Sequence, residues 1–239
     1  MRTIKNPNEI VDEFVRDYRA LFCDDLISVA MFGSAVTHEY QPGISDINMV
    51  LVLKDDAIPV IAKAVSAAKK WSRRRVAIPF FMTKDFIASA LDSYPVEFLD
   101  IRSNYRILHG EDPFAHLDIK REHLRLQCER ELRGVALHLR KEFIRCGGRP
   151  ATLSMLLSAS MKKLLPVFKA MAVLHDKPVP KLKSDVIMAV EDMYNLGASA
   201  LSEVLHPHTK PKNREAWTAL FDNYAKTIDT LIRNIDEKP

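Results

Sequence analysis

The sequence has few cysteines and no long apolar run, and each absence excludes a class of protein. The three cysteines are widely spaced and lack the spacing of metal ligands, so they predict reduced thiols rather than a disulfide framework or a zinc site. No stretch approaches the run of about eighteen apolar residues that spans a bilayer, and the N-terminal segment lacks the apolar core of a signal peptide. We therefore expect a cytoplasmic protein with no membrane partner.

A strong excess of charge is also missing. The formal net charge is +4 over 239 residues, which does not by itself indicate a nucleic-acid partner. One basic cluster, from Lys69 to Arg75, falls at the end of a predicted helix, where cations complement the helix dipole. Contact with a polyanionic partner such as RNA through Arg73–Arg75 is the alternative interpretation, and it is not favoured.

The pattern of apolar and turn-forming residues predicts an α/β first half followed by a purely helical second half. The content of hydrophobic residues, 47%, is ample for a packed core in one large domain or two small ones. We place the boundary near Pro113, giving domains 1–113 and 114–239 and an α+β fold. The elements expected in the first domain are helices over Pro7–Phe22, Pro59–Arg74 and Lys84–Leu91, and strands over Leu26–Phe32, Asn48–Leu53, Val76–Met82 and Tyr94–Ile101.

The stretch Val29–Leu53 organises the first domain. An apolar strand ends in Gly33-Ser34, a polar connection follows, and a second strand begins after Asp46-Ile47-Asn48. Side chains two apart on a strand point the same way, so Asp46 and Asn48 are expected to face one site. Glycine lets a backbone turn approach a phosphate closely, and side-chain oxygens suit a hard metal ion. The pattern therefore predicts a phosphate at the turn and a metal ion on the next strand.

This arrangement resembles the motif of the nucleotidyltransferase superfamily, which has the polymerase beta-like fold. That motif is an apolar strand, Gly-Ser or Gly-Gly, roughly ten intervening residues, and Asp-x-Asp or Asp-x-Glu on the next strand; here eleven residues separate Ser34 from Asp46. Asn48 stands where the family places its second carboxylate. The resemblance implies that Gly33 and Ser34 bind the triphosphate and that Asp46 and Asn48 bind the metal.

The resemblance also implies a third carboxylate from a neighbouring strand, shortly before a segment ending in Leu-x-Gly. Ile107–Gly110 is such a segment, so we assign Glu97, on the strand expected over Tyr94–Ile101, as the third metal ligand or the general base. Asp100 is the reserve candidate. In the helical half, Lys162 and Lys163 interrupt an apolar helix. Reaching the triphosphate is the role that the resemblance implies for them, and snorkelling surface lysines are the alternative.

The two-domain layout is similar to that of bacterial aminoglycoside nucleotidyltransferases. The resemblance implies transfer of a nucleotide, AMP from ATP first of all, to a hydroxyl of a small molecule or protein, with one or two Mg²⁺ ions assisting in-line attack. The catalytic residues would then be Asp46 and Glu97. The competing hypothesis is a catalytically inactive protein of this fold that binds nucleotide or a partner protein, which Asn48 favours. The sequence names neither the acceptor nor the oligomeric state.

Overall fold

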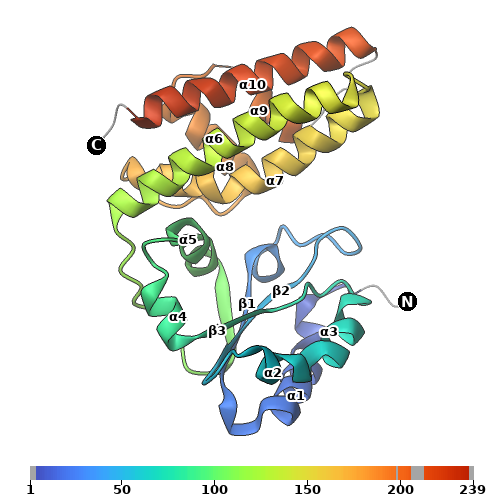
Figure 1. Cartoon of the computed structure of the whole chain (residues 1–239), viewed down its shortest axis with the longest axis vertical. Coiled ribbons are helices and arrows are strands. Elements are labelled where there is room, and N and C mark those ends of the chain that lie inside the picture. Colours follow the sequence, from blue (N-terminus) through green and yellow to red (C-terminus); the bar gives the residue numbers. More distant parts are fainter. Residues whose placement is uncertain (1–3, 198, 206–212, 237–239) are drawn as a thin grey trace. The chain divides into compact units, whose positions relative to one another are not determined.

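The chain is described by a computed structural model that covers residues 4–197, 199–205 and 213–236 (Figure 1). It divides into two compact units. A sheet unit contains the chain up to Asp92 together with Phe98–Asp118, and a helical unit contains Ser93–Glu97 together with the chain from Ile119 onward. Each unit is described below by itself.

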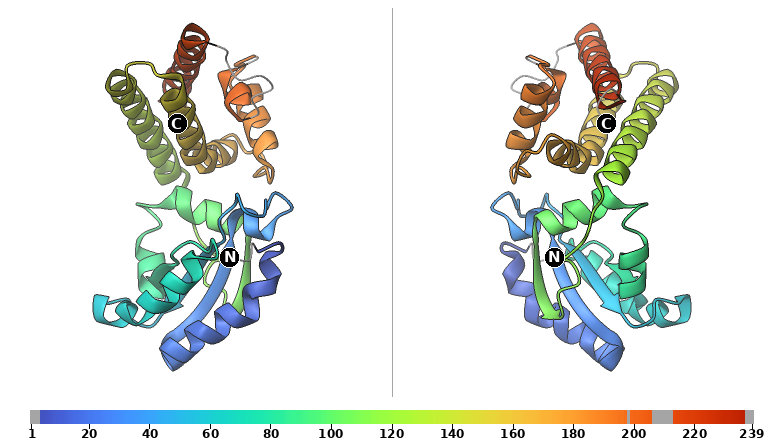
Figure 2. Two further views of the ribbon diagram at one scale, coloured as in Figure 1. Left: turned by 90° about the vertical axis from the view of Figure 1, so that its right-hand side faces the viewer. Right: turned by 90° about the vertical axis from the view of Figure 1, so that its left-hand side faces the viewer.

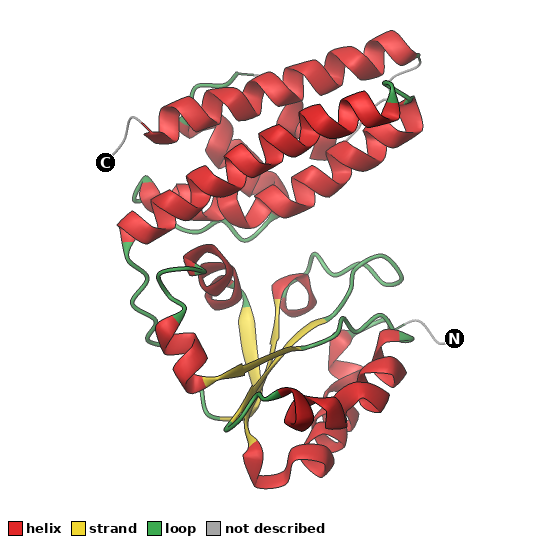
Figure 3. Cartoon of the chain, viewed as in Figure 1, coloured by secondary structure: helices red, strands yellow, loops and turns green. Residues whose placement is uncertain are grey.

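The sheet unit contains a mixed four-stranded sheet in the order β3-β2-β1-β4 (Figure 3). The central strand β1 pairs antiparallel with both β2 and β4, and β2 pairs parallel with β3. The α+β fold class with a mixed sheet is confirmed. The strands are β1 Leu26–Phe32, β2 Asn48–Leu53, β3 Phe80–Thr83 and β4 Tyr105–Gly110.

Short helices connect and flank these strands, and two of them begin at a side-chain cap. The Asn6 side chain accepts a hydrogen bond from the Asn8 N–H, and the Thr83 hydroxyl accepts one from the Phe86 N–H. The helical elements of this half are η1 Pro7–Ile10, α1 Val11–Phe22, η2 Cys23–Asp25, η3 Gly33–Val36, α2 Ile58–Ile61, η4 Ala62–Ala64, α3 Val65–Ser72, α4 Lys84–Ser89 and α5 Pro95–Ser103.

The core of the sheet unit lies between one face of the sheet and the helices α1 and α3. Phe14 of α1 and Trp71 of α3 are fully buried, with their ring centroids 5.2 Å apart. They pack in one cluster with Met31 of β1 and Leu51 of β2. The Trp71 indole N–H donates to the Asp17 carboxylate at 3.0 Å, so its polar atom is satisfied although the ring is buried. This packing fixes the strands whose ends carry the candidate site.

Glu13 of α1 joins that helix electrostatically to the end of α3. Its two carboxylate oxygens accept from Lys70 at 2.8 Å and from Arg74 at 2.6 Å. These hydrogen bonds lower the pKa of Glu13 from its ordinary value of 4.5 to about 2. Because the pKa is lowered in the folded protein, the Glu13 carboxylate stabilises the fold fully above its ordinary pKa of 4.5. This stabilisation is lost as the pH falls toward about 2.

We therefore expect Glu13→Gln to lower the free energy of unfolding at neutral pH by about 1 kcal/mol, a small value because the pair is partly exposed. The difference from wild type should shrink between about pH 4.5 and about pH 2, as the wild-type carboxylate becomes protonated. Urea unfolding at several pH values measures this. Glu9→Gln, at an exposed neighbouring acid, is the matched control, and a Glu13→Gln effect that does not vary with pH would contradict the assignment.

The helical unit is built mainly on three long helices that pack against one another (Figure 2). Helix α6 ends where Gly147 adopts a left-handed conformation, which glycine favours at a helix C-terminus. Helix α7 continues through Pro166. The shorter helices α8 and α9 pack on α7. The bounds are α6 Arg121–Cys146, α7 Pro150–Leu174, α8 Lys183–Met193, α9 Ala200–Leu205 and α10 Arg214–Asp236.

Three expectations about the first half are corrected. Residues 94–101 were expected to form a strand, but Pro95–Ser103 is the helix α5. Buried residues recur there at i, i+3 spacing, and Pro95 begins the helix in the position that proline favours. The strand expected over Val76–Met82 is shortened to β3, with an isolated bridge between Val76 and Ile47, because Pro79 interrupts it. The helix expected over Pro59–Arg74 is divided into α2, η4 and α3.

No helix in the described ranges combines the length and the apolar character needed to cross a bilayer. All three cysteines are free, Cys23 exposed and Cys128 and Cys146 buried. Burial raises the pKa of the Cys128 thiol well above its usual range, so this cysteine is an unreactive core residue.

Candidate nucleotide-binding site

The Gly33-Ser34 turn lies at the end of the central strand, directly beside Asn48. Phe32 pairs with Asn48 across the β1–β2 ladder, and Gly33 has φ +74°, a left-handed conformation that favours glycine. A Cβ atom added at Gly33 would lie 3.4 Å from the Asn48 side-chain nitrogen. The structure therefore brings together the predicted phosphate turn and one of the predicted metal ligands.

Several hydrogen-bonding groups of this turn are already used within the protein. The Gly33 N–H donates to the Asn104 carbonyl at 2.8 Å, and the Ser34 carbonyl accepts from the Thr37 N–H and hydroxyl, both at 3.1 Å. No described residue bonds to the Ser34 hydroxyl, which is half-buried in η3. The turn therefore offers a phosphate the Ser34 hydroxyl and, because Gly33 has no side chain, a close approach to the backbone beside Asn48.

Asp46 lies two residues before the start of β2 and is paired with an arginine. Its side chain is 60% exposed, and one carboxylate oxygen lies 3.2 Å from the Arg75 guanidinium. The same guanidinium nitrogen donates to the Ile44 carbonyl at 2.6 Å. The backbone holds the two residues in register, because the Ile47 N–H donates to the Arg75 carbonyl at 2.9 Å. The candidate metal-binding carboxylate thus has a cationic partner.

The strands around Asn48 contribute no further carboxylate, since none of the four described strands contains an acidic residue. Asn48 and Val50 share one face of β2, and the residue that pairs with Val50 on β3 is Phe80. The Phe80 ring stacks beside that of Phe32, with centroids 6.1 Å apart, and stays 54% exposed. The neighbouring strand β3 therefore contributes an aromatic side chain and no carboxylate to the face of the sheet that carries Asn48.

Glu97 does not lie on a strand, although the resemblance implies that the third carboxylate comes from one. It is on α5, where its carboxylate accepts a hydrogen bond from the Gln127 side chain at 2.6 Å. Gln127 is itself buried, and its oxygen accepts from the Val96 N–H at 2.8 Å. This contact of Glu97 is thus a structural one within the helical unit. Its role as metal ligand or base stays a prediction.

Lys162 and Lys163 are both exposed on α7 of the helical unit. The Lys163 ammonium lies 3.0 Å from a carboxylate oxygen of Glu131 on α6. The exposure of both lysines matches the snorkelling alternative that the sequence left open. Their contact with a triphosphate stays a prediction.

The donor set of the turn does not fit a pair of Mg²⁺ ions held by protein carboxylates. In the part of the chain that the structure describes, no group of three or more His, Cys, Asp and Glu side chains is placed to hold a metal ion. At the turn, Asp46 supplies one carboxylate, which faces Arg75, and Asn48 supplies a neutral amide oxygen. Magnesium is held in proteins by several hard, mostly anionic oxygens. The turn as it stands lacks such a set.

Sequence reasoning missed the part that Arg75 and Tyr40 take in this region. Tyr40 donates its hydroxyl to the Ile4 carbonyl at 3.2 Å, and burial raises its pKa, while Arg75 and Asp46 act on that pKa with opposite signs. The signal for Arg75 was indirect. Arg75 directly precedes Val76, which forms a bridge with Ile47. A correct prediction of this strand pairing would therefore have placed Arg75 beside Asp46.

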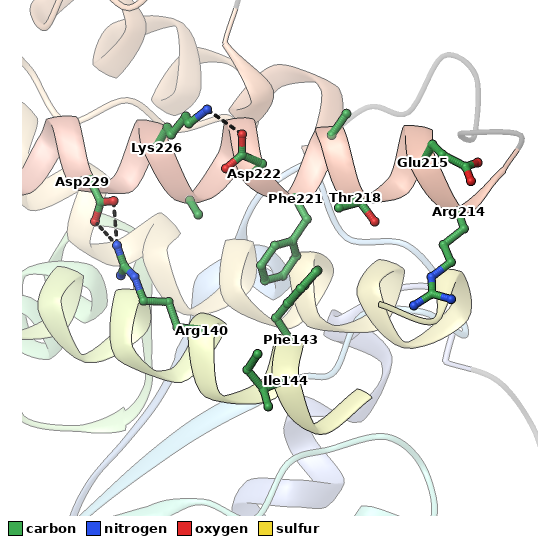
Figure 4. Close-up of a pocket in the computed structure, with 12 residues that line it drawn as sticks. Arg140, Phe143, Ile144, Arg214, Glu215, Thr218, Phe221, Asp222, Lys226 and Asp229 are labelled. Atoms are coloured by element: carbon green, nitrogen blue, oxygen red, sulfur yellow. Dashed lines mark hydrogen bonds and ion pairs between the residues drawn. The ribbon is translucent and has the colours of Figure 1, made fainter. Parts of the chain in front are cut away.

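A separate hollow of about 880 Å³ lies between α6 and α10 of the helical unit (Figure 4). The rings of Phe143 and Phe221 lie between the two helices with their centroids 5.2 Å apart, and Arg140 and Asp229 form an ion pair at 2.7 Å to one side of them. None of its lining residues belongs to the predicted site.

The mixed sheet, the Gly-Ser turn beside the head of β2 and the helical second unit together define a nucleotidyltransferase-like two-domain fold. A solved structure with this fold is that of spectinomycin adenyltransferase AAD(9) from Enterococcus faecialis, determined with ATP and spectinomycin. It matches with a TM-score of 0.57 at 11% sequence identity, over 96% of this chain and 99% of that one. No model of a known protein family and no curated protein matches the sequence. The similarity therefore establishes the fold.

Proposed function

We propose that this protein binds a nucleoside triphosphate, ATP first of all, at the turn formed by Gly33 and Ser34 and flanked by Asp46 and Asn48. The observation that carries the proposal is the left-handed Gly33 directly against Asn48 at the head of β2, in a nucleotidyltransferase-like fold. The solved structure of similar fold was determined with ATP, which supports the choice of nucleotide. ATP use also agrees with the cytoplasmic location expected from the sequence.

The reaction that fits this fold is transfer of AMP from ATP to a hydroxyl of a small molecule or protein, and we propose that it is slow in this protein. At about 4 Å and an effective dielectric near 20, one carboxylate facing a divalent ion contributes roughly 8 kcal/mol of gross attraction. Asn48 is neutral, so this attraction is missing at the second position of the Asp-x-Asp motif. If only a third of it survives desolvation, the loss is about 100-fold in metal affinity. A magnesium ion would then be held chiefly by the phosphates of ATP.

Gly33→Ala tests whether the turn binds nucleotide. The added Cβ occupies the space above the turn and strains a left-handed residue, so we expect ATP affinity to fall at least about tenfold in calorimetric titration. Gly147→Ala is the matched control, because Gly147 also has a positive φ but caps α6 and has open space around its Cβ position. Equal losses in both variants would indicate general destabilisation, and unchanged affinity in Gly33→Ala would contradict the site.

A non-catalytic module that binds a partner protein is the second candidate function. The ion pair between Asp46 and Arg75 favours it, because a carboxylate already engaged by a cation is a poorer metal ligand. The two functions differ in a simple measurement. A protein-interaction module without nucleotide shows no heat of ATP binding with or without magnesium, whereas the proposed function requires saturable binding.

A further inference from the structure

The backbone at Arg75 has an unusual conformation and is fixed by several contacts. Its φ is +62°, in the left-handed region that a residue with a side chain adopts at a cost. The Arg75 N–H donates to the Ser72 carbonyl, the Arg75 carbonyl accepts from Ile47, and Val76 directly after it forms a parallel bridge with Ile47. The strained backbone at Arg75 thus places its guanidinium beside Asp46, just before the first residue of β2.

The side chains of Asp46, Asn48 and Arg75 together lack the net negative charge that a metal site requires. With Asp46 at −1, Asn48 neutral and Arg75 at +1, the three residues sum to zero, whereas an Asp-x-Asp pair alone carries −2. A doubly negative site repels a free triphosphate until divalent ions neutralise it. A neutral site with a guanidinium does not.

The guanidinium also has donors left for a ligand. Arginine carries five N–H groups in a planar fork that matches phosphate oxygens, and one Arg75 nitrogen contacts both Asp46 and the Ile44 carbonyl. The side chain is 46% exposed, and exposed ion pairs are weak, so a phosphate can compete with Asp46 for it.

We propose that Arg75 is a phosphate-binding residue that supplies the positive charge for the triphosphate, so that ATP binds at this turn without Mg²⁺. The inference rests on the proposed function and deepens it, because it names the charge state of the ligand that the site accepts. In the free protein, Asp46 acts as a stand-in for the phosphate. On binding, the guanidinium exchanges the carboxylate for a phosphate oxygen, and no covalent bond changes.

The experiment is calorimetric titration of ATP into the full-length protein, once in excess EDTA and once with Mg²⁺. We expect wild type to bind metal-free ATP at least as tightly as Mg·ATP. Arg75→Gln should weaken binding of metal-free ATP by about tenfold to hundredfold, the range for loss of a hydrogen bond to a charged group. Arg75→Lys should recover part of the loss. Arg73→Gln removes the same charge from an exposed position two residues away and should leave affinity unchanged.

Asp46→Asn gives the sharpest separation between a metal site and an arginine site. It removes the competitor for Arg75 and one negative charge, so we expect tighter binding of metal-free ATP. A metal site held by Asp46 predicts the opposite, a loss of binding. Thermal unfolding of each variant verifies that it is folded, and Arg75→Lys keeps the test valid if Arg75→Gln does not fold.

Each outcome has a distinct meaning. Binding that requires Mg²⁺ and is indifferent to Arg75→Gln, or abolition of binding by Asp46→Asn, overturns the role of Arg75 and leaves the proposed function standing. Absence of ATP binding to wild type under both conditions overturns the proposed function itself. Metal-free binding that is lost in Arg75→Gln and kept in Arg73→Gln supports both.

Discussion

Asn48→Asp is expected to convert the turn toward a metal-dependent site. The new carboxylate restores the charge that the Asp-x-Asp motif carries, so Mg²⁺-dependent ATP binding should tighten by about 100-fold, the factor that one carboxylate facing a divalent ion contributes after desolvation. AMP transfer to added hydroxyl acceptors should become faster, because the ion then bridges protein and phosphate. Binding of metal-free ATP should weaken, since the added charge repels the triphosphate.

Titration in EDTA and in Mg²⁺, together with release of pyrophosphate from ATP, measures these three changes. Asn223→Asp, an exposed asparagine on α10, makes the same change of charge and serves as the control. If Asn48→Asp alters neither the magnesium dependence nor the metal-free affinity, residue 48 does not face the ligand. The assignment of the turn would then be wrong.

Gly110→Ala is expected to have the largest effect on stability. A Cβ at Gly110 would lie 1.9 Å from the Ile27 carbonyl oxygen and 2.9 Å from its carbon, at a φ of +79°. Both contacts are with backbone atoms of the neighbouring strand β1, so the β1–β4 pairing must shift. We expect the free energy of unfolding to fall by about 3 kcal/mol. The Ser28 hydroxyl bond to the Glu111 carbonyl, 2.7 Å long, should be lost with it.

Gly134→Ala is the matched control within the same chain. Gly134 lies inside α6, and a Cβ there would meet nothing within 4 Å. Alanine in a helix interior is more favourable than glycine by about 0.5–1 kcal/mol, so this variant should unfold at a slightly higher temperature than wild type. Scanning calorimetry compares the two. Equal unfolding temperatures for Gly110→Ala and wild type would show that the close approach to Ile27 is not maintained in solution.

The sequence was informative where structure is determined by neighbouring residues. The predicted strands Leu26–Phe32 and Asn48–Leu53 are the observed β1 and β2, because apolar runs bounded by turn residues specify a buried strand locally. The Gly33-Ser34 turn was found for the same reason. The Leu-x-Gly segment also carried information: its glycine is required by the close approach of Gly110 to Ile27.

The sequence was misleading where tertiary packing decides. In Pro95–Ser103 almost every position between the charged residues is buried, so alternation and helical spacing both fit, and the strand was chosen wrongly. Glu97 was therefore placed on an expected strand, ahead of the Leu-x-Gly segment by which it was selected. Arg75 was assigned to a helix end because its cationic cluster suits a helix dipole. Its contact with Asp46 depends on a parallel bridge between residues 47 and 76, which no local pattern reveals.

A crystal structure with a nonhydrolysable ATP analogue and Mg²⁺ would show whether the Gly33 turn and Arg75 together hold the triphosphate. We expect the phosphates to lie against Ser34 and the Arg75 guanidinium, with Asp46 released from the arginine and any magnesium held by phosphate oxygens. Two ions bridged by Asp46 and Asn48, or a nucleotide bound away from the Gly33 turn, would show that this assignment is wrong.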